Sequence, residues 1–381
     1  MPSLSTQPPL GLYVHIPWCV RKCPYCDFNS HESRTIPEAD YIAALLQDLR
    51  QDQQLAQGRA IDSIFFGGGT PSLFSADSYD ALLQSINQII PIAPSAEITL
   101  EANPGTFEYE KFAGFYKAGI NRLSLGVQSF DPNQLKALGR IHNRDEAINA
   151  IRAARAVGFE KLNIDLMHGL PQQTVTSALT DLQQAISLEP SHLSWYQLTI
   201  EPNTVFYNKP PLLPEDDDLG DIEDAGKALL QQQGFQQYET SAYAKPGFQC
   251  AHNLNYWRFG DYLAIGSGAH GKITERDNGK VMRYQKTRLP QDYLNPLKAF
   301  TARQQTIAAQ DLPFEFFMNA LRLQEPIPKT LFNARTGLKV DVVKQTMLEA
   351  IDQGLLLDQG DCWRTTELGQ RFLNTLLNLF Q

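Results

Sequence analysis

The chain has 381 residues, of which 43% are hydrophobic and 20% charged, the composition of a globular protein rather than a disordered or fibrous one. Its 33 basic and 42 acidic residues give a net charge of −9, which argues against a broad nucleic-acid-binding surface. At about 100–200 residues per domain, the length predicts two or three domains.

The compartment is indicated by the cysteines and by the absence of targeting signals. No stretch approaches 18 apolar residues, so no transmembrane helix is predicted. Residues 1–10 have neither a basic run nor an apolar core, so no signal peptide is predicted. The cysteines number five, and three of them (Cys19, Cys23 and Cys26) lie within eight residues. A disulfide framework needs paired cysteines and an oxidising compartment, whereas this number is odd and three cysteines are clustered. We therefore expect a metal or cluster site in a reducing cytoplasm.

The first 200 residues alternate short apolar runs with longer amphipathic segments. The runs, several of them apolar on both faces, predict strands at 12–16, 63–66, 97–101, 122–126, 161–166 and 192–199. The amphipathic segments predict helices at 39–55, 77–90, 108–117, 144–157 and 177–188. Six repeats of this kind imply an open or closed parallel barrel with right-handed crossovers. In such barrels the chemistry lies beyond the C-terminal ends of the strands.

The alternation of predicted strands and helices ends after residue 199. Residues 201–224 are rich in proline and acidic residues and predict a solvated loop leading into a helix at 221–233, and 238–270 is too irregular for assignment. Beyond residue 311 we expect helices at 313–323 and 340–353, a hairpin at 355–364 and a last helix at 368–379. This order of elements resembles a winged helix. These changes divide the chain into a barrel (1–235), a mixed segment (236–305) and a mainly helical C-terminal domain (306–381).

The cysteine-rich loop is the strongest chemical signal. Cys19, Cys23 and Cys26 follow the first predicted strand with three and two residues between them. Three thiolates cannot complete a four-iron cluster, because each iron needs a ligand, so one iron stays open to a small molecule. The alternative is a zinc site with His15 or His31 as fourth ligand, although zinc motifs usually pair their cysteines in two separated knuckles.

This loop resembles that of the radical S-adenosylmethionine superfamily. Over nearly the whole chain the sequence resembles the oxygen-independent coproporphyrinogen III oxidase-like family within it, and most of all the heme chaperone branch of that family. The matching stretches are 13–30, 66–73, 101–105, 125–130, 163–171, 193–204 and 238–271. The resemblance implies a partial (β/α)6 barrel that holds a 4Fe–4S cluster and S-adenosylmethionine.

The resemblance also assigns residues to the S-adenosylmethionine site. Three consecutive glycines and a threonine, residues 67–70, follow the second strand, and glycine lets backbone groups approach a ligand closely; the family places the methionine end there. Glu101, at the end of the third strand, could accept hydrogen bonds from an amine or a ribose. The full implied set is Tyr13, Tyr25, Gly68, Gly69, Thr70, Glu101, Gln128, Arg140 and Asp165.

One position departs from the pattern of the oxidases. They carry a further cysteine two residues after the third cluster cysteine, where this chain has Phe28. Phenylalanine cannot ligate a metal, form a side-chain hydrogen bond or shuttle an electron. The departure favours the chaperone branch over the oxidases.

A second motif bears on heme. His252 and Asn253 precede Tyr256 and Trp257, and an imidazole among aromatic rings could ligate heme iron and stack on a porphyrin. The heme chaperones share this His-Asn-x-x-Tyr-Trp pattern, which the resemblance links to heme binding. His270 is a lesser candidate ligand, and no c-type attachment motif occurs.

These observations predict a cytoplasmic heme chaperone that carries a 4Fe–4S cluster and S-adenosylmethionine and transfers heme to an acceptor protein. A flavodoxin- or ferredoxin-type electron donor is a further expected partner. The rival hypothesis is an oxygen-independent coproporphyrinogen III oxidase.

Overall fold

The computed structural model describes residues 7–105 and 108–381. Most of the N-terminal stretch for which no signal peptide is predicted, residues 1–6, lies outside this part of the chain. Within the described residues, none of the helices has the length and apolar character to cross a membrane.

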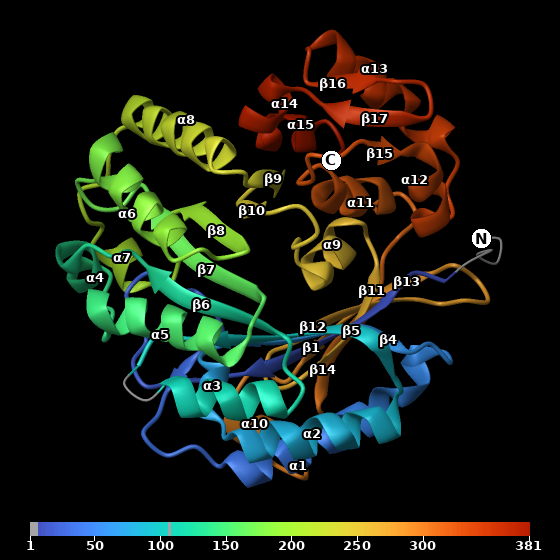
Figure 1. The fold of residues 1–381 in the computed structure, drawn as a ribbon. Helices are drawn as coiled ribbons and strands as arrows, with labels where there is room; N and C mark the ends of the chain where they lie inside the picture. Colours follow the sequence, from blue (N-terminus) through green and yellow to red (C-terminus); the bar gives the residue numbers. More distant parts are fainter. Residues whose placement is uncertain (1–6, 106–107) are drawn as a thin grey trace.

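Six parallel strands form the centre of one large sheet (Figure 1). They lie side by side in the order β1-β4-β5-β6-β7-β8, and each neighbouring pair is parallel. Their bounds are Leu10–Ile16, Ile61–Gly68, Ile92–Ala102, Arg122–Gln128, Lys161–His168 and His192–Gln197. All six predicted strands are present, and most are longer than predicted.

Strands from later in the chain extend the sheet at both edges. Beside β8 lie the antiparallel strands β10 (Ala242–Ala244) and β9 (Gln236–Glu239). Beside β1 lies β11 (Asp261–Ile265), parallel to it, followed by the antiparallel strands β12 (His270–Thr274), β13 (Val281–Lys286) and β14 (Thr301–Thr306). The described sheet has twelve strands and ends at β14 and β9 without closing, which confirms a partial rather than a closed barrel.

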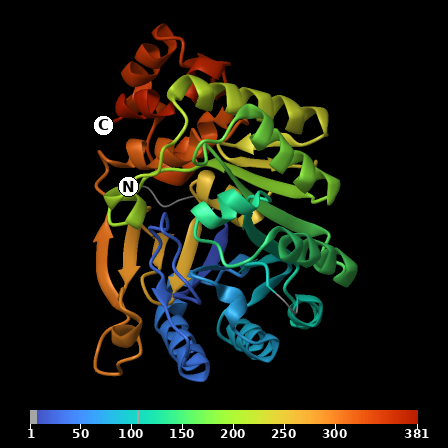
Figure 2. The ribbon, with the colours of Figure 1, turned by 90° about the vertical axis from the view of Figure 1, so that its left-hand side faces the viewer.

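Helices cover the outer face of the parallel strands. They lie below and to the left of the sheet in Figure 1, and below and to the right in the side view of Figure 2. The longer ones are α1 (Glu38–Asp52), α2 (Ala76–Ile89), α3 (Glu108–Lys117), α5 (Arg144–Val157), α6 (Val175–Ser187) and α8 (Asp216–Gln232). The first five confirm the predicted helices to within a few residues. The prediction for α8 was wrong at its start, because Asp216, Asp217 and Asp218 form its first turn, where acidic side chains are favourable. Shorter elements are β2 (Trp18–Cys19), β3 (His31–Glu32), α4 (Pro132–Ala137), α7 (Val205–Asn208), α10 (Pro290–Tyr293) and the 3-10 turns Gln53–Ala56 and Pro71–Leu73.

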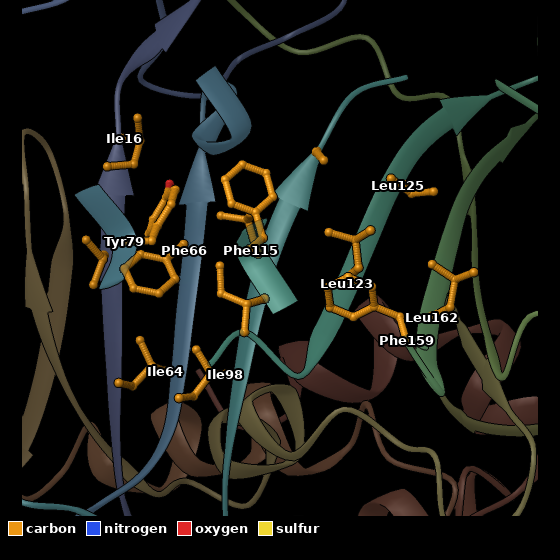
Figure 3. Close-up of a cluster of buried hydrophobic side chains, with 14 of the residues drawn as sticks. Ile16, Ile64, Phe66, Tyr79, Ile98, Phe115, Leu123, Leu125, Phe159 and Leu162 are labelled. Atoms are coloured by element: carbon orange, nitrogen blue, oxygen red, sulfur yellow. The ribbon is translucent and has the colours of Figure 1, made fainter. Parts of the chain in front are cut away.

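The main core fills the layer between these strands and helices (Figure 3). Alternate strand residues such as Ile64, Phe66 and Leu123 are fully buried there, because successive side chains of a strand point to opposite faces. The opposite, concave face differs from the expectation of strands that are apolar on both sides. It carries a set of buried or half-buried polar residues: Ser63, Glu97, Thr99, Glu101, Arg122, Ser124, Asn163, Asp165 and Ser194.

The irregular region 238–270 contains one helix that lies inside the molecule. This is α9 (Ala251–Trp257), which contacts β1, β4 and β11 on the concave side of the sheet and α11 of the C-terminal region. In Figure 1 it lies between the sheet and the C-terminal helices. It therefore covers the part of the concave face that β1, β4 and β11 form.

The C-terminal region has a hydrophobic core of its own, around Phe316, Phe332 and Trp363. The predicted hairpin is present as β16 (Leu356–Asp358) and β17 (Cys362–Thr365), with β15 (Ile327–Pro328) on its other side. The helices here are α11 (Leu312–Ala320), α12 (Lys329–Thr336), α13 (Lys344–Asp352), α14 (Glu367–Arg371), α15 (Leu373–Asn378) and the 3-10 turn Val340–Val343. Of these, α12 was not predicted, and the helix predicted at 340–353 begins as the 3-10 turn. The single last helix predicted at 368–379 is two helices, α14 and α15, divided at Phe372.

The threefold division of the chain remains our proposal. In the structure the middle segment, 236–305, supplies strands to the main sheet, whereas 306–381 packs around the separate core. We propose that the middle segment extends the open sheet of the barrel at both edges.

The core predicts a stability difference between two aromatic residues of α3. Phe115 is fully buried, with its ring edge-on to Tyr79, so Phe115→Ala should lower the free energy of unfolding by about 3–5 kcal/mol. Tyr109 on the same helix is 56% exposed, and Tyr109→Ala should change the free energy of unfolding by less than about 0.5 kcal/mol. Urea unfolding followed by circular dichroism checks both, and equal effects would contradict the packing.

Candidate functional site

The three clustered cysteines lie in a loop that two short strands close. Cys19 ends β2, which pairs with β3, while Cys23 and Cys26 lie in the turn between these strands and are joined by a hydrogen bond from the Cys26 amide to the Cys23 carbonyl (3.1 Å). All three thiols are free and line one cavity beyond the C-terminal end of β1. The loop thus presents three thiols to a common space.

Each of these sulfurs faces a polar side chain. Thr70 Oγ1 donates to the Cys19 sulfur (3.5 Å), Arg140 Nη1 donates to that of Cys23 (3.5 Å), and the Ser30 hydroxyl lies 3.6 Å from that of Cys26. Hydrogen bonds to the sulfurs tune an iron–sulfur cluster and orient its ligands. The donor set therefore fits a cluster held by three thiolates.

His15, one fourth ligand considered for zinc, uses both ring nitrogens within the protein. Nε2 faces the Asn29 carbonyl oxygen (2.8 Å) and Nδ1 faces the Tyr13 hydroxyl (3.0 Å). Burial lowers the pKa of His15 to about 4. No three His, Cys, Asp or Glu side chains within residues 7–105 and 108–381 converge as a single metal ion requires.

The glycine loop after β4 comes close to the cysteine loop. Gly68 has φ +115°, and a Cβ there would lie 2.5 Å from the His15 ring. A Cβ at Gly69 would lie 2.5 Å from the Trp18 carbonyl oxygen. Only glycine fits at these two positions, and the glycine backbone, with Thr70, forms one wall of the cavity.

Two buried carboxyl groups lie on the concave face. Glu101 Oε2 accepts a hydrogen bond from the Gly68 amide (3.1 Å), and burial, together with the charge of Asp165, raises the pKa of Glu101 to about 8. Asp165 accepts from Ser124 Oγ (3.1 Å) and Asn163 Nδ2 (2.7 Å), and burial raises its pKa as well. Both face the cavity and could accept hydrogen bonds from ligand hydroxyls.

Arg140 joins the cysteine loop to two strand ends. Besides its contact with Cys23, it donates through Nη2 to Asn103 Oδ1 (2.6 Å) and the Gly126 carbonyl oxygen (2.5 Å). Gln128, in a left-handed conformation (φ 71°) at the irregular end of β6, accepts from the Tyr196 hydroxyl (2.7 Å). Both side chains line the cavity.

The structure brings nearly all of the expected S-adenosylmethionine residues together with the cysteines. One cavity of about 520 Å³ is lined by Cys19, Cys23, Tyr25, Cys26, Gly68, Gly69, Thr70, Glu101, Gln128, Arg140 and Asp165. Tyr13 lies instead in a neighbouring cavity of about 640 Å³, which shares Gly68 and Glu101 with the first.

The sequence interpretation missed several residues of the first cavity. These are Asn103, Arg122, Ser194, Tyr196, Glu239 and Arg322. Polar residues at every second position of a strand, as at Asn163 and Asp165, are the signal that could have indicated some of them. Arg322 follows α11, and no local signal connects it with the barrel.

His252 lies behind the cavities rather than in them. It is 1% exposed, its Nδ1 lies 2.9 Å from the Ser63 hydroxyl, and its ring stacks on Phe65. Its Nε2 is buried with no hydrogen-bond partner among the described residues. Burial lowers the pKa of His252 to about 3, so the imidazole is neutral at pH 7.

The other residues of the His-Asn-x-x-Tyr-Trp motif reach the cavities. Asn253 lines the first cavity, Tyr256 the second, and Trp257 both. His270, the lesser candidate, is exposed on β12 and lines the second. The motif thus forms the partition between the two spaces, with the His252 imidazole packed edge-on against Tyr256.

Known families match both parts of the chain. The radical SAM superfamily matches residues 13–182, and the HemN C-terminal domain matches residues 307–372. The heme chaperone HemW of Escherichia coli K12 is 55% identical over 98% of this chain and 98% of its own length. That of Haemophilus influenzae is 55% identical over 100% of this chain and 99% of its own.

Among solved structures, coproporphyrinogen III oxidase (HemN) from Escherichia coli, a radical SAM enzyme, has the same fold. The TM-score is 0.83, and the match covers 98% of this chain and 90% of that one, at 23% identity. At this identity the likeness establishes the fold alone.

The site predicts a cluster that depends on three cysteines. Protein reconstituted without oxygen should hold about four irons and four sulfides per chain. Replacing Cys19, Cys23 or Cys26 by serine should abolish this, because each thiol lines the same cavity. The matched control is Cys362→Ser, since Cys362 lies in the C-terminal hairpin. Equimolar zinc without sulfide in the unaltered protein would refute the prediction.

Proposed function

The chain belongs to the HemW family of radical SAM proteins, and from this premise we propose that it is a heme chaperone that binds heme and hands it to an acceptor protein. The observation that carries the proposal is the likeness to heme chaperones along nearly the whole chain. The position of the motif helix α9 between two cavities adds a structural reason.

We propose that Cys19, Cys23 and Cys26 hold a 4Fe–4S cluster. Such a cluster, when bound, supplies an electron and one iron open to a further ligand. The protein's part is to hold the thiolates and to donate hydrogen bonds to them from Thr70 and Arg140.

We assign S-adenosylmethionine to the same cavity. The glycines and Thr70 offer backbone groups at close range, and Arg140 supplies a cation beside the cluster loop. Glu101 and Asp165 would accept hydrogen bonds from its hydroxyl or amino groups. Tyr25, Gln128, Gly68 and Gly69 complete the proposed set in this cavity, and Tyr13 belongs to it from the neighbouring cavity.

For heme we propose His252 as the iron ligand, with Asn253, Tyr256 and Trp257 around the ring. A metal-bound imidazole commonly directs its other nitrogen at a fixed hydrogen-bond partner, and Ser63 occupies that place here. The free Nε2 is then the nitrogen available to iron. Because Nε2 is buried, α9 would have to shift relative to β1 and β4 for this nitrogen to hold the iron.

Phe28 supports the chaperone over the oxidase. It is 64% exposed and lines both cavities beside the cysteine loop. An apolar ring there offers a porphyrin contact surface but no ligand, proton or electron. We propose that coproporphyrinogen III oxidase activity is absent.

We propose the cytoplasm as the compartment, because the five cysteines are unpaired and three of them suit a cluster. The acceptor hemoprotein and a flavodoxin- or ferredoxin-type electron donor are the partners that this function requires.

Heme binding should depend on His252. In His252→Ala the iron loses its ligand, so the Soret band of the heme complex should shift and heme should pass faster to apomyoglobin. Some heme binding should persist, because the ring is still buried. The matched control is His168→Ala, a buried histidine beside Trp195 that lines neither cavity. An unchanged spectrum in folded His252→Ala, together with a changed one in His270→Ala, would move the ligand to His270.

The oxidase reaction should fail. Cluster-loaded protein with S-adenosylmethionine, a reductant and coproporphyrinogen III should form no protoporphyrinogen IX in an anaerobic assay followed by chromatography. Phe28→Cys should not restore the reaction, because the substrate pocket must differ too. Turnover by the unaltered protein would contradict the proposal and favour the oxidase.

A further inference from the structure

A buried arginine lies at the far end of the first cavity from the cysteine loop. Arg122 is the first residue of β6, and its side chain is 3% exposed and lines the cavity. Gln128, at the cysteine end, is six residues further along the strand, a separation of about 20 Å at about 3.3 Å per residue. No described side chain forms a hydrogen bond or ion pair with the Arg122 guanidinium.

Two carboxyl groups whose charges act on Arg122, those of Glu97 and Asp165, already have other partners. Glu97 forms an ion pair with Lys161 (3.0 Å) and accepts a hydrogen bond from the Ala251 amide (2.8 Å). Asp165 is bonded to Ser124 and Asn163. A buried charge is costly unless it is paired and hydrogen-bonded, so Arg122 has capacity for an anion that enters the cavity.

Arg122 remains a cation in this setting. Burial alone would lower its pKa, but the nearby acidic groups of Cys250 and Glu97 outweigh burial, so that the pKa is raised. A guanidinium offers five N–H donors in a planar fork that matches a carboxylate.

A second arginine reaches the same cavity from the C-terminal region. The Arg322 guanidinium carbon lies 4.6 Å from the centre of the Trp257 ring, and its Nε is buried without a partner among the described residues. Arg322 and Trp257 both line the cavity. Two cations from distant parts of the chain therefore face one space beside a flat aromatic ring.

We propose that Arg122 and Arg322 bind the propionate carboxylates of the porphyrin, whose ring lies against Trp257. This rests on the proposed heme chaperone function and deepens it by assigning the acidic edge of heme to the end of the cavity away from the cysteines. The other carboxylate at hand, that of S-adenosylmethionine, would belong at the cysteine end, where Cys19, Cys23 and Cys26 would hold the cluster with its open iron.

Paired titrations of the cluster-loaded protein with heme and with heme dimethyl ester, which lacks free carboxylates, test the proposal. The unaltered protein should bind heme about 10–100-fold more tightly than the ester, the range for hydrogen bonds to charged groups. In Arg122→Gln and in Arg322→Gln this preference should fall toward one, while the affinity for the ester stays the same.

The matched control is Arg283→Gln. Arg283 lines the second cavity and is already paired with Glu315, so its replacement should leave the preference unchanged. The proposal would be overturned if Arg122→Gln kept the full preference for heme over its ester, or if only Arg283→Gln lost that preference. If Arg122→Gln fails to fold, judged by circular dichroism and cluster absorbance, Arg122→Lys and Arg322→Gln decide between the same outcomes.

Two further readouts separate the sources of failure. If Arg122→Gln weakens binding of S-adenosylmethionine and keeps the preference for heme over its ester, the carboxylate belongs to S-adenosylmethionine and the propionate assignment is wrong. If the unaltered protein binds neither heme nor the ester, the chaperone function itself fails. If it binds both equally, only the carboxylate site fails.

Discussion

The alternation of side chains along the six parallel strands is the constraint on which the rest of the molecule depends. Leu123 and Leu125 face the helices, while Ser124 between them faces the concave side. Because successive side chains point to opposite faces, one backbone layer serves both a dry core and a polar cavity. The helices exclude water from the first face, and the second remains free for α9 and for ligands.

The concave face gathers more buried charge than a protein core accepts without compensation. Much of it is balanced within the protein: Arg140 bonds to Asn103, Gly126 and Cys23, and Asp165 bonds to Ser124 and Asn163. These contacts tie the cysteine loop to the ends of neighbouring strands. Arg122, which also lines the cavity and takes no part in these contacts, is the group with capacity for a ligand.

The chain shares its fold with an oxidase and its family with heme chaperones. Because function depends on the site rather than on the scaffold, we propose that particular positions carry the difference. Phe28 projects beside the cysteine loop, and α9 places its aromatic rings between two cavities. Phe28 and α9 both border the cavities between the parallel strands and the later segments of the chain, which is where the proposed heme site lies.

Hydrophobic periodicity, with glycine and proline between the elements, determined the strands and helices of the first 200 residues, because parallel β-α repeats depend on local hydrophobic patterns. Short spacing determined the cysteine loop, since Cys19, Cys23 and Cys26 are too close in the chain to separate. Part of the polar lining, including Arg122, Ser194 and Tyr196, was not foreseen, because a strand's pattern does not reveal which face is concave. Only the tertiary structure decided that His252 is buried behind the cavity and that Arg122 and Arg322 face one space. Those placements depend on how α9 and the C-terminal region pack onto the sheet, and contacts between residues 200 apart leave no local signal.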